Sequence, residues 1–117
     1  MSELLRLAEV MNKLRSPGGC PWDAEQTHES LVKYLLEESY EFVDTLESGD
    51  RAGMREELGD ILLQVYFHAR IAQDSVEDPF TIEDVAQSIT EKLIRRHPHV
   101  FGDAKVSGSG EVLENWE

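Results

Sequence analysis

The sequence predicts an all-α fold, an antiparallel bundle of about four helices. In four separate segments apolar residues recur at steps of three and four, which is the spacing of one helix face. Stretches rich in Gly, Pro, Ser and Asp separate these segments, and the apolar-polar alternation of a half-buried strand does not occur in the sequence. The 117 residues fit one domain spanning positions 1–117, since autonomous domains mostly have about 100–150 residues. Helices this close in sequence pack as antiparallel neighbours.

The first helix is expected to run from Ser2, as its N-cap, to about Leu14. Residues 15–26 then predict a loop, because two prolines and two adjacent glycines lie within RSPGGCPWDAEQ. A loop of a dozen residues is longer than a helix connection requires. Such loops are often functional.

The second helix is expected to begin at Thr27 and to end near Leu46. A glutamate, Glu38, lies in its apolar stripe, with Leu35 before it and Phe42 after it. Charged residues seldom occupy such a seam unless a partner compensates for their burial. Glu38 is therefore a candidate functional residue.

The third helix is expected from about Met54 to Ala72, after a break at Ser48, Gly49 and Asp50. Its core-facing positions have helical spacing. They are Leu58, Ile61, Leu62, Val65, Ala69 and Ala72.

The fourth helix is expected to open at Thr81, because Thr81 with Asp84 resembles a capping box. Pro98 ends this helix. Residues 99–117 are expected to form an irregular tail followed by a short helix from Glu111.

The charge balance excludes several partner classes. Eleven Lys and Arg oppose 24 Asp and Glu, which gives a formal charge of −13. A field of that sign repels nucleic acid and anionic membranes, so neither is expected as a partner. No apolar run approaches the roughly 20 residues of a membrane helix, and residues 1–10 lack the features of a signal peptide. We therefore expect a cytoplasmic protein.

Two pairs of acids predict a metal site. Glu38 with Glu41, and Glu57 with Asp60, are three residues apart and so share a helix face. The second and third helices are antiparallel neighbours, and their acidic faces can then oppose each other. Crowded carboxylates repel and lose hydration, which a hard divalent cation with oxygen ligands compensates. The expected cofactor is Mg²⁺, with Mn²⁺ as a substitute.

The alternative is that these acids form solvated faces, as charge runs usually do. Two observations favour the metal site. Glu38 interrupts an apolar stripe. Gly59, inside a helix, costs about 1 kcal/mol relative to Ala, which indicates a close approach at the level of Asp60.

Basic and aromatic residues are candidates for substrate binding. Three of the eleven basic residues lie within five positions of each other: Lys92, Arg95 and Arg96. They stabilise a helix C-terminus by about 0.3–1 kcal/mol, or they bind a polyphosphate. Lys33, one turn before Glu37, is a weaker candidate for the same role. Trp116 could stack on a base or cover the core.

Five segments, in order, resemble the MazG family of nucleoside triphosphate pyrophosphohydrolases, most of all the N-terminal domain of two-domain members. The segments are GGCPWDAEQTHESL, YLLEESYE, EELGDILLQVYFHARIA, KLIRRHPHVFGD and VLENWE. They span nearly the whole chain. The family is marked by EExxE followed by ExxD, and both motifs are present here.

The resemblance implies an enzyme, a nucleotide diphosphatase that hydrolyses NTPs or dNTPs to the monophosphate and pyrophosphate in nucleotide-pool housecleaning. It implies that Glu38, Glu41, Glu57 and Asp60 bind Mg²⁺. It also implies that Glu37 orients or deprotonates the attacking water, with Glu41 as the competing choice.

The resemblance leaves one alternative function open, and it also bears on the oligomeric state of the chain. The alternative is a catalytically weak or silent domain that serves dimerisation or regulation in a larger MazG-type protein. The third helix is apolar on more than one face, which indicates burial on more than one face. Together with the resemblance, this predicts a homodimer or a dimer of dimers.

Overall fold

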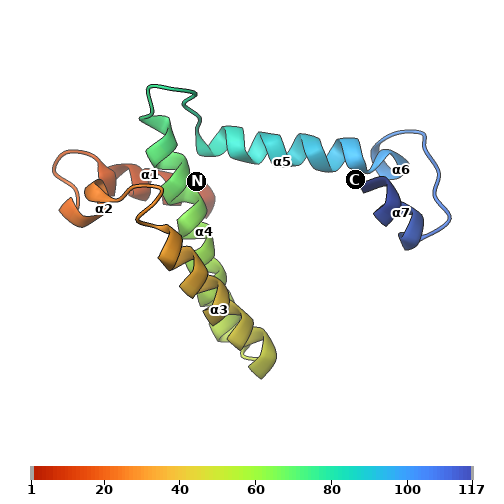
Figure 1. Ribbon diagram of the computed structural model, residues 1–117, viewed down its shortest axis with the longest axis horizontal. Coiled ribbons are helices and arrows are strands. Elements are labelled where there is room, and N and C mark those ends of the chain that lie inside the picture. The colour runs from red at the N-terminus through yellow and green to blue at the C-terminus, as the bar shows by residue number, and fades with distance from the viewer. Residues whose placement is uncertain (1, 117) are drawn as a thin grey trace. The chain divides into compact units, whose positions relative to one another are not determined.

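The computed structural model describes the backbone of residues 2–116 and the side chains of residues 2–113. The described part contains helices and no strand, so the all-α prediction is confirmed. The chain divides into two compact units, Met1–Ile82 and Glu83–Glu117. The helices are α1 Glu3–Arg15, α2 Pro21–Glu25, α3 Val32–Ser48, α4 Arg51–Gln73, α5 Ile82–Arg96, α6 Pro98–Phe101 and α7 Ser109–Trp116 (Figure 1).

Helix α1 begins where the sequence predicted. The Ser2 hydroxyl accepts a hydrogen bond from the Leu5 amide at 3.2 Å, which satisfies one of the free N–H groups of the first turn. The expected N-cap is confirmed. The helix ends at Arg15, one residue beyond the expected Leu14.

The expected loop at residues 15–26 contains a short helix, α2. Pro21 stands at its first position, where a missing N–H costs nothing and the fixed φ favours the helix. The Arg15 guanidinium donates to the carbonyl oxygens of Asp23 at 2.7 Å and Gln26 at 3.0 Å. These bonds attach α2 to the end of α1.

The predicted helix start at Thr27 is wrong, because α3 begins at Val32. Thr27 and Ser30 instead bond reciprocally: the Thr27 amide donates to Ser30 Oγ at 2.9 Å, and the Ser30 amide donates to Thr27 Oγ1 at 3.0 Å. These side chains satisfy the local amides in a turn, as Ser and Thr commonly do. The turn places Leu31 in the core, with 1% of its surface exposed.

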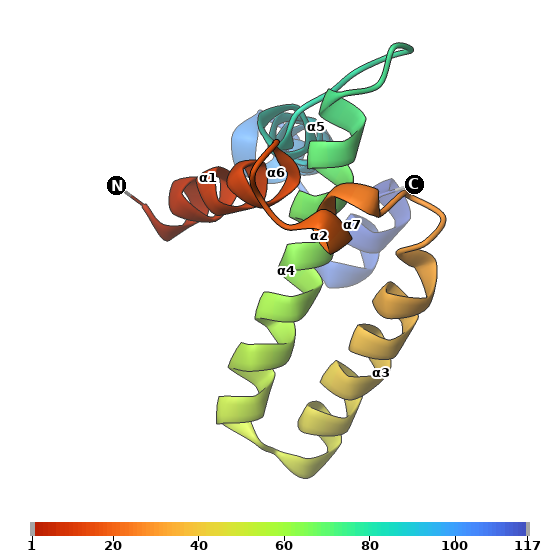
Figure 2. The same ribbon diagram turned by 90° about the vertical axis from the view of Figure 1, so that its left-hand side faces the viewer.

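Helices α3 and α4 form an antiparallel hairpin, and they lie side by side in both views (Figures 1 and 2). Gly49 ends α3 with φ 70°, a left-handed conformation that favours glycine. The Asp50 carboxylate then accepts from the Gly53 amide at 3.0 Å and caps α4. Helix α4 therefore starts at Arg51, three residues before the expected Met54.

The buried face of α4 differs from the expected one. Leu58 and Val65 were expected to face the core but are 51% and 39% exposed, whereas Tyr66 and Phe67 are buried. The Tyr66 hydroxyl donates to the Leu4 carbonyl at 3.1 Å, because α1 packs against this face of α4. Because α4 packs against α1 as well as α3, its buried face differs from the one that the spacing predicted.

The core of this unit consists of Met11, Leu31 and Phe67, one residue from each of three segments. Because Phe67 belongs to the C-terminal half of α4, the core occupies the end of the hairpin opposite the Gly49 turn. The half nearer the turn contains none of these three core residues. Partly buried apolar residues pack around the core, namely Leu14, Tyr34, Leu63 and Ile71.

The second unit also contains more helix than expected. Helix α5 ends at Arg96, before Pro98, as the sequence predicted. The expected irregular tail contains α6, and α7 begins at Ser109, two residues before the expected Glu111. The Glu111 carboxylate accepts from the Ser107 amide at 2.8 Å. In the part that the structure describes, no helix combines the length and the apolar character that spanning a membrane requires.

Candidate metal centre

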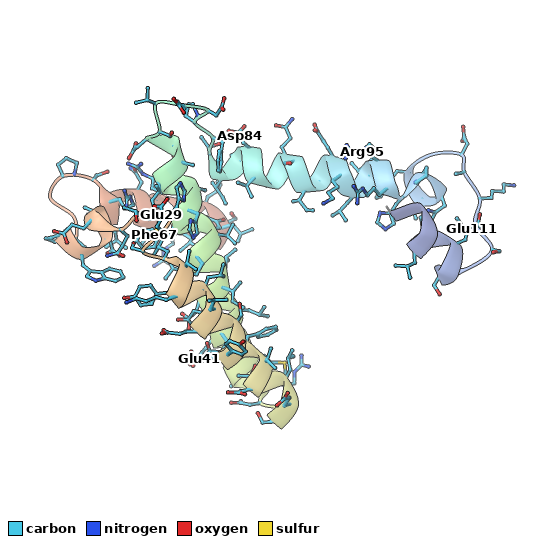
Figure 3. All side chains as sticks on the ribbon, in the orientation of Figure 1. Glu29, Glu41, Phe67, Asp84, Arg95 and Glu111 are labelled. Atoms are coloured by element: carbon cyan, nitrogen blue, oxygen red, sulfur yellow. The ribbon has the colours of Figure 1, made fainter. Side chains whose placement is uncertain are left out.

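The α3–α4 hairpin brings three of the four predicted metal ligands together. One carboxylate oxygen from each of Glu38, Glu41 and Glu57 lies within 4.8 Å of the other two. Figure 3 labels Glu41 midway along α3. The core sets this register, since Leu31 and Phe67 meet beyond the acids and the two helices then run back towards the turn.

Two of these oxygens are buried without a partner. Glu38 Oε2 and Glu57 Oε2 are inaccessible to water and have no hydrogen-bond partner among the described residues. An acceptor atom left without a partner and shielded from water destabilises the fold, and a charged one does so more. The site therefore has unused capacity for a cation.

The pKa of the Glu38 carboxyl is strongly perturbed. This pKa is raised to about 7 from an ordinary value of 4.5, mainly by burial and then by the charges of Asp60, Glu41 and Glu57, in that order of size. Both causes disfavour the charged form. Without a cation, Glu38 is therefore partly protonated near neutral pH.

Glu57 shares this perturbation. Burial raises the pKa of Glu57, and the nearby Glu41 and Asp60 carboxylates act in the same direction. The two carboxyls act on each other in opposite directions: Glu57 raises the pKa of Glu38, whereas Glu38 lowers the pKa of Glu57. Asp60 lies outside the 4.8 Å group, and its connection to the site is electrostatic.

The donor set fits a hard divalent cation. Mg²⁺ binds oxygen ligands at about 2.0–2.1 Å, so its ligand oxygens lie roughly 3–4 Å from one another. The observed limit of 4.8 Å needs only a small closure of flexible glutamates. Carboxylates without nitrogen or sulfur donors favour Mg²⁺ or Mn²⁺ over softer metals.

The other two α3 candidates are exposed to solvent. Glu37 is exposed and lies on α3 beside Glu38. Lys33 is exposed one turn earlier, with its Nζ 5.1 Å from the centre of the Tyr34 ring. Both side chains can therefore reach a ligand from solvent.

The remaining basic candidates belong to the second unit. Lys92 and Arg96 are half-buried and one turn apart on α5, and Arg95 between them is exposed. The side chain of Trp116 lies outside the described residues, so its predicted contact with a base stays a prediction.

The expected close approach at Gly59 is not present within the described chain. A side chain added at Gly59 would meet no atom within 4 Å. Helices α3 and α1 both pack against α4, but neither brings an atom to this position. Gly59 thus lies on an open surface.

The sequence patterns did not single out Gln64, a polar residue that is buried on α4. Gln64 is 7% exposed and lies one turn beyond Asp60, and its amide oxygen is buried without a partner in the described part of the chain. The sequence does contain a signal for this residue, because Gln64 is a polar residue between apolar ones, as Glu38 is. A neutral amide attracts less notice because it leaves the charge pattern unchanged.

Comparison with known proteins identifies relatives along the whole chain. Residues 26–101 match the MazG nucleotide pyrophosphohydrolase domain. The chain is 54% identical to the nucleoside triphosphate pyrophosphohydrolase/pyrophosphatase MazG of Thermotoga maritima, over 95% of this chain and 41% of that protein. It is 47% identical to the nucleoside triphosphate pyrophosphohydrolase of Escherichia coli K12, over 100% of this chain and 44% of that protein.

A solved structure shows the same fold. The crystal structure of a mazG-related protein from Thermotoga maritima superposes with a TM-score of 0.75 at 29% sequence identity, covering 96% of this chain and 94% of that one. The chain spans less than half the length of the two curated relatives above.

Proposed function

The chain belongs to the MazG nucleotide pyrophosphohydrolase family, and on that premise we propose that it hydrolyses nucleoside triphosphates, NTPs or dNTPs, to nucleoside monophosphate and pyrophosphate. Water adds to the α-phosphorus, the bond to the β-phosphate oxygen breaks, and one proton is released. The observation that supports this reaction most strongly is the convergence of Glu38, Glu41 and Glu57 with unpaired buried oxygens.

The cofactor in this proposal is Mg²⁺, with Mn²⁺ as a substitute. Glu38, Glu41 and Glu57 would hold it, with Asp60 as the fourth carboxylate. When bound, a divalent cation neutralises the triphosphate oxygens and acidifies water. The net charge of −13 would otherwise repel the substrate.

The other candidate side chains have separate roles in this proposal. Glu37, exposed beside Glu38, orients the attacking water and accepts its proton, and Glu41 is the alternative acceptor. Lys33 lies one turn away and contacts the triphosphate. Charge on the leaving pyrophosphate is neutralised by Lys92, Arg95 and Arg96, and Trp116 stacks on the base.

The first prediction is pyrophosphate release from some members of a panel of eight NTPs and dNTPs with Mg²⁺. Removal of the metal with EDTA is expected to abolish release, because the four carboxylates then repel the triphosphate. Release is measured by a coupled pyrophosphate assay. Activity towards free phosphate monoesters serves as the control and is expected to be absent.

A second candidate function is that of a catalytically silent dimerisation or regulatory domain. It is the alternative left open by the resemblance to the N-terminal domain of two-domain members. Nucleotide binding without pyrophosphate release from any of the eight substrates would support it. The role we favour, clearing the cytoplasmic nucleotide pool, requires turnover.

We also propose that the chain assembles as a homodimer or a dimer of dimers. Large apolar side chains on the hairpin are exposed, including Leu36 at 56%, Tyr40 at 73% and Leu58 at 51%. Apolar surface of this extent on a soluble chain indicates an interface. The open space at Gly59 is on the same helix as Leu58.

The second prediction tests whether two chains share a site. Mixing an inactive Glu38→Gln chain with an inactive Lys92→Ala/Arg96→Ala chain is expected to restore part of the activity, because some mixed dimers contain one undamaged composite site. Sedimentation gives the oligomeric state of each sample. A stable dimer without restored activity would confine each site to one chain, and a monomer at micromolar concentration would contradict the dimer.

A further inference from the structure

Two histidines that the proposed reaction does not use, His28 and His68, meet although they are 40 positions apart in the sequence. His28 Nδ1 and His68 Nδ1 are 2.8 Å apart, and the ring planes are parallel to within 2° with centroids 5.1 Å apart. Face-to-face rings cannot bring atoms closer than about 3.5 Å without repulsion, so the rings meet edge to edge. The contact is a hydrogen bond between two ring nitrogens.

This bond joins two segments that are 40 positions apart. His28 lies in the turn before α3, and His68 lies on α4. The 16–31 segment, which contains α2, runs from the end of α1 to the start of α3. Figure 3 labels Glu29 in the turn of this segment and Phe67 in the core beside His68. The histidine pair therefore attaches the segment to α4.

The bond depends on protonation. A neutral imidazole has one N–H and one acceptor nitrogen, so one ring donates through Nδ1 and the other accepts. A singly protonated pair keeps the bond, because the imidazolium donates and the neutral ring accepts. When both rings are protonated, both Nδ1 atoms are donors and the two charges repel.

We propose that the His28–His68 pair is a pH-sensitive latch that holds the 16–31 segment on α4 while at least one ring is neutral and releases it when both rings are protonated. Of the described residues in the turn, Leu31 alone is buried, and the latch links its position to the charge of the exposed His28 ring and the half-buried His68 ring.

The surrounding charges set the direction of this response. Burial lowers the pKa of His68 from its ordinary value of 6.5, His28 lowers it further, and Glu29 acts in the opposite direction. The groove beside His28 is also lined by Arg15 of α1, Glu25 of α2 and Asp74 after α4, so both signs of charge lie next to His28. A base with a lowered folded-state pKa contributes stability that is present above 6.5 and lost as the pH falls.

The test uses two substitutions of His28 in the full chain without metal. His28→Asn places an amide oxygen and nitrogen where Nδ1 stood, so the bond to His68 remains and one titrating charge is removed. His28→Ala removes the bond at every pH. The backbone amide resonances of Thr27 to Leu31 report the position of the segment by ¹⁵N NMR between pH 8 and pH 5.

The parent chain is expected to match His28→Asn at pH 8 and His28→Ala at pH 5, with the released fraction rising by up to about tenfold per pH unit, as one added proton requires. His28→Asn is expected to keep the pH 8 resonances throughout. His99→Gln, which removes a histidine from the second unit, is the matched control and is expected to behave as the parent.

Three results would overturn the latch. In the first, His28→Asn shows the same transition as the parent, which would assign the change to the carboxylates. In the second, the parent shows no transition between pH 8 and pH 5. In the third, His28→Ala has the parent's resonances at pH 8, which would show that the bond does not hold the segment.

Discussion

Glu38→Gln is expected to reduce pyrophosphate release at least about 100-fold while the chain stays folded. Changes to groups that only support a metal ligand already cost about 10- to 100-fold, and Glu38 is itself at the centre of the carboxylate group. The amide has the same shape as the carboxyl but no charge for a cation. The measurement is the turnover number with Mg²⁺ and the preferred nucleotide.

The same substitution is expected to raise the melting temperature of the metal-free protein above pH 7. The folded-state pKa of Glu38 is raised to about 7, so its ionisation destabilises the fold as the pH rises from its ordinary 4.5 through 7. The advantage of Glu38→Gln is expected to disappear below pH 4.5, where the parent carboxyl is protonated in both states.

Glu47→Gln is the matched control. It removes the same charge from α3 at an exposed position nearer the Gly49 turn, and we expect parental turnover and little change in stability. A Glu38→Gln chain that hydrolyses nucleotides at the parental rate would exclude Glu38 from the metal site and remove the central proposal.

Mg²⁺ binding is expected to weaken by up to about tenfold for each pH unit below 7, because the cation requires deprotonated ligands. Glu38, with a pKa of about 7, must lose its proton on binding, and the raised pKa of Glu57 adds to this requirement. Above pH 8 the affinity is expected to level off. Calorimetry between pH 6 and 8 in buffers of different ionisation enthalpy measures both the affinity and the protons released.

Bound Mg²⁺ is also expected to raise the melting temperature, since a ligand at 100 times its Kd stabilises the folded state by about 2.7 kcal/mol. The Glu38→Gln chain provides the control. Its amide has no proton to lose when Mg²⁺ binds, so any remaining Mg²⁺ affinity is expected to depend less on pH. A parent chain with pH-independent Mg²⁺ affinity would contradict the role of Glu38. Absence of any Mg²⁺ heat, with and without nucleotide, would contradict the metal centre itself.

Local patterns in the sequence were sufficient for most helices and for the composition of the acidic site. The Ser2 cap, the end of α5 before Pro98 and the three-residue spacing of Glu38 and Glu41 depend only on neighbours within one turn. Such neighbours are close in any helix, whatever packs around it. The short helix α2 was also within reach of this reasoning, since Pro21 is favourable at a first helical position.

Contacts between segments could not be predicted from such local patterns. Leu58 and Val65 have core spacing, yet they are exposed, because α4 turns Tyr66 and Phe67 towards α1 and the core. Helical periodicity defines a face but not the neighbour that covers it. Gly59 was interpreted as a close approach for the same reason, and open space lies there.

The acids and the histidines show which features the sequence determines and which depend on the tertiary structure. That Glu38 is out of place in an apolar stripe is evident from its sequence neighbours. Its pKa of about 7 depends on burial and on Glu57 and Asp60 from another helix, and so requires the α3–α4 register. The His28–His68 bond spans 40 positions without any periodicity. Spacing along one helix is set by backbone geometry, whereas the meeting of two segments is set by how side chains fill the space between them.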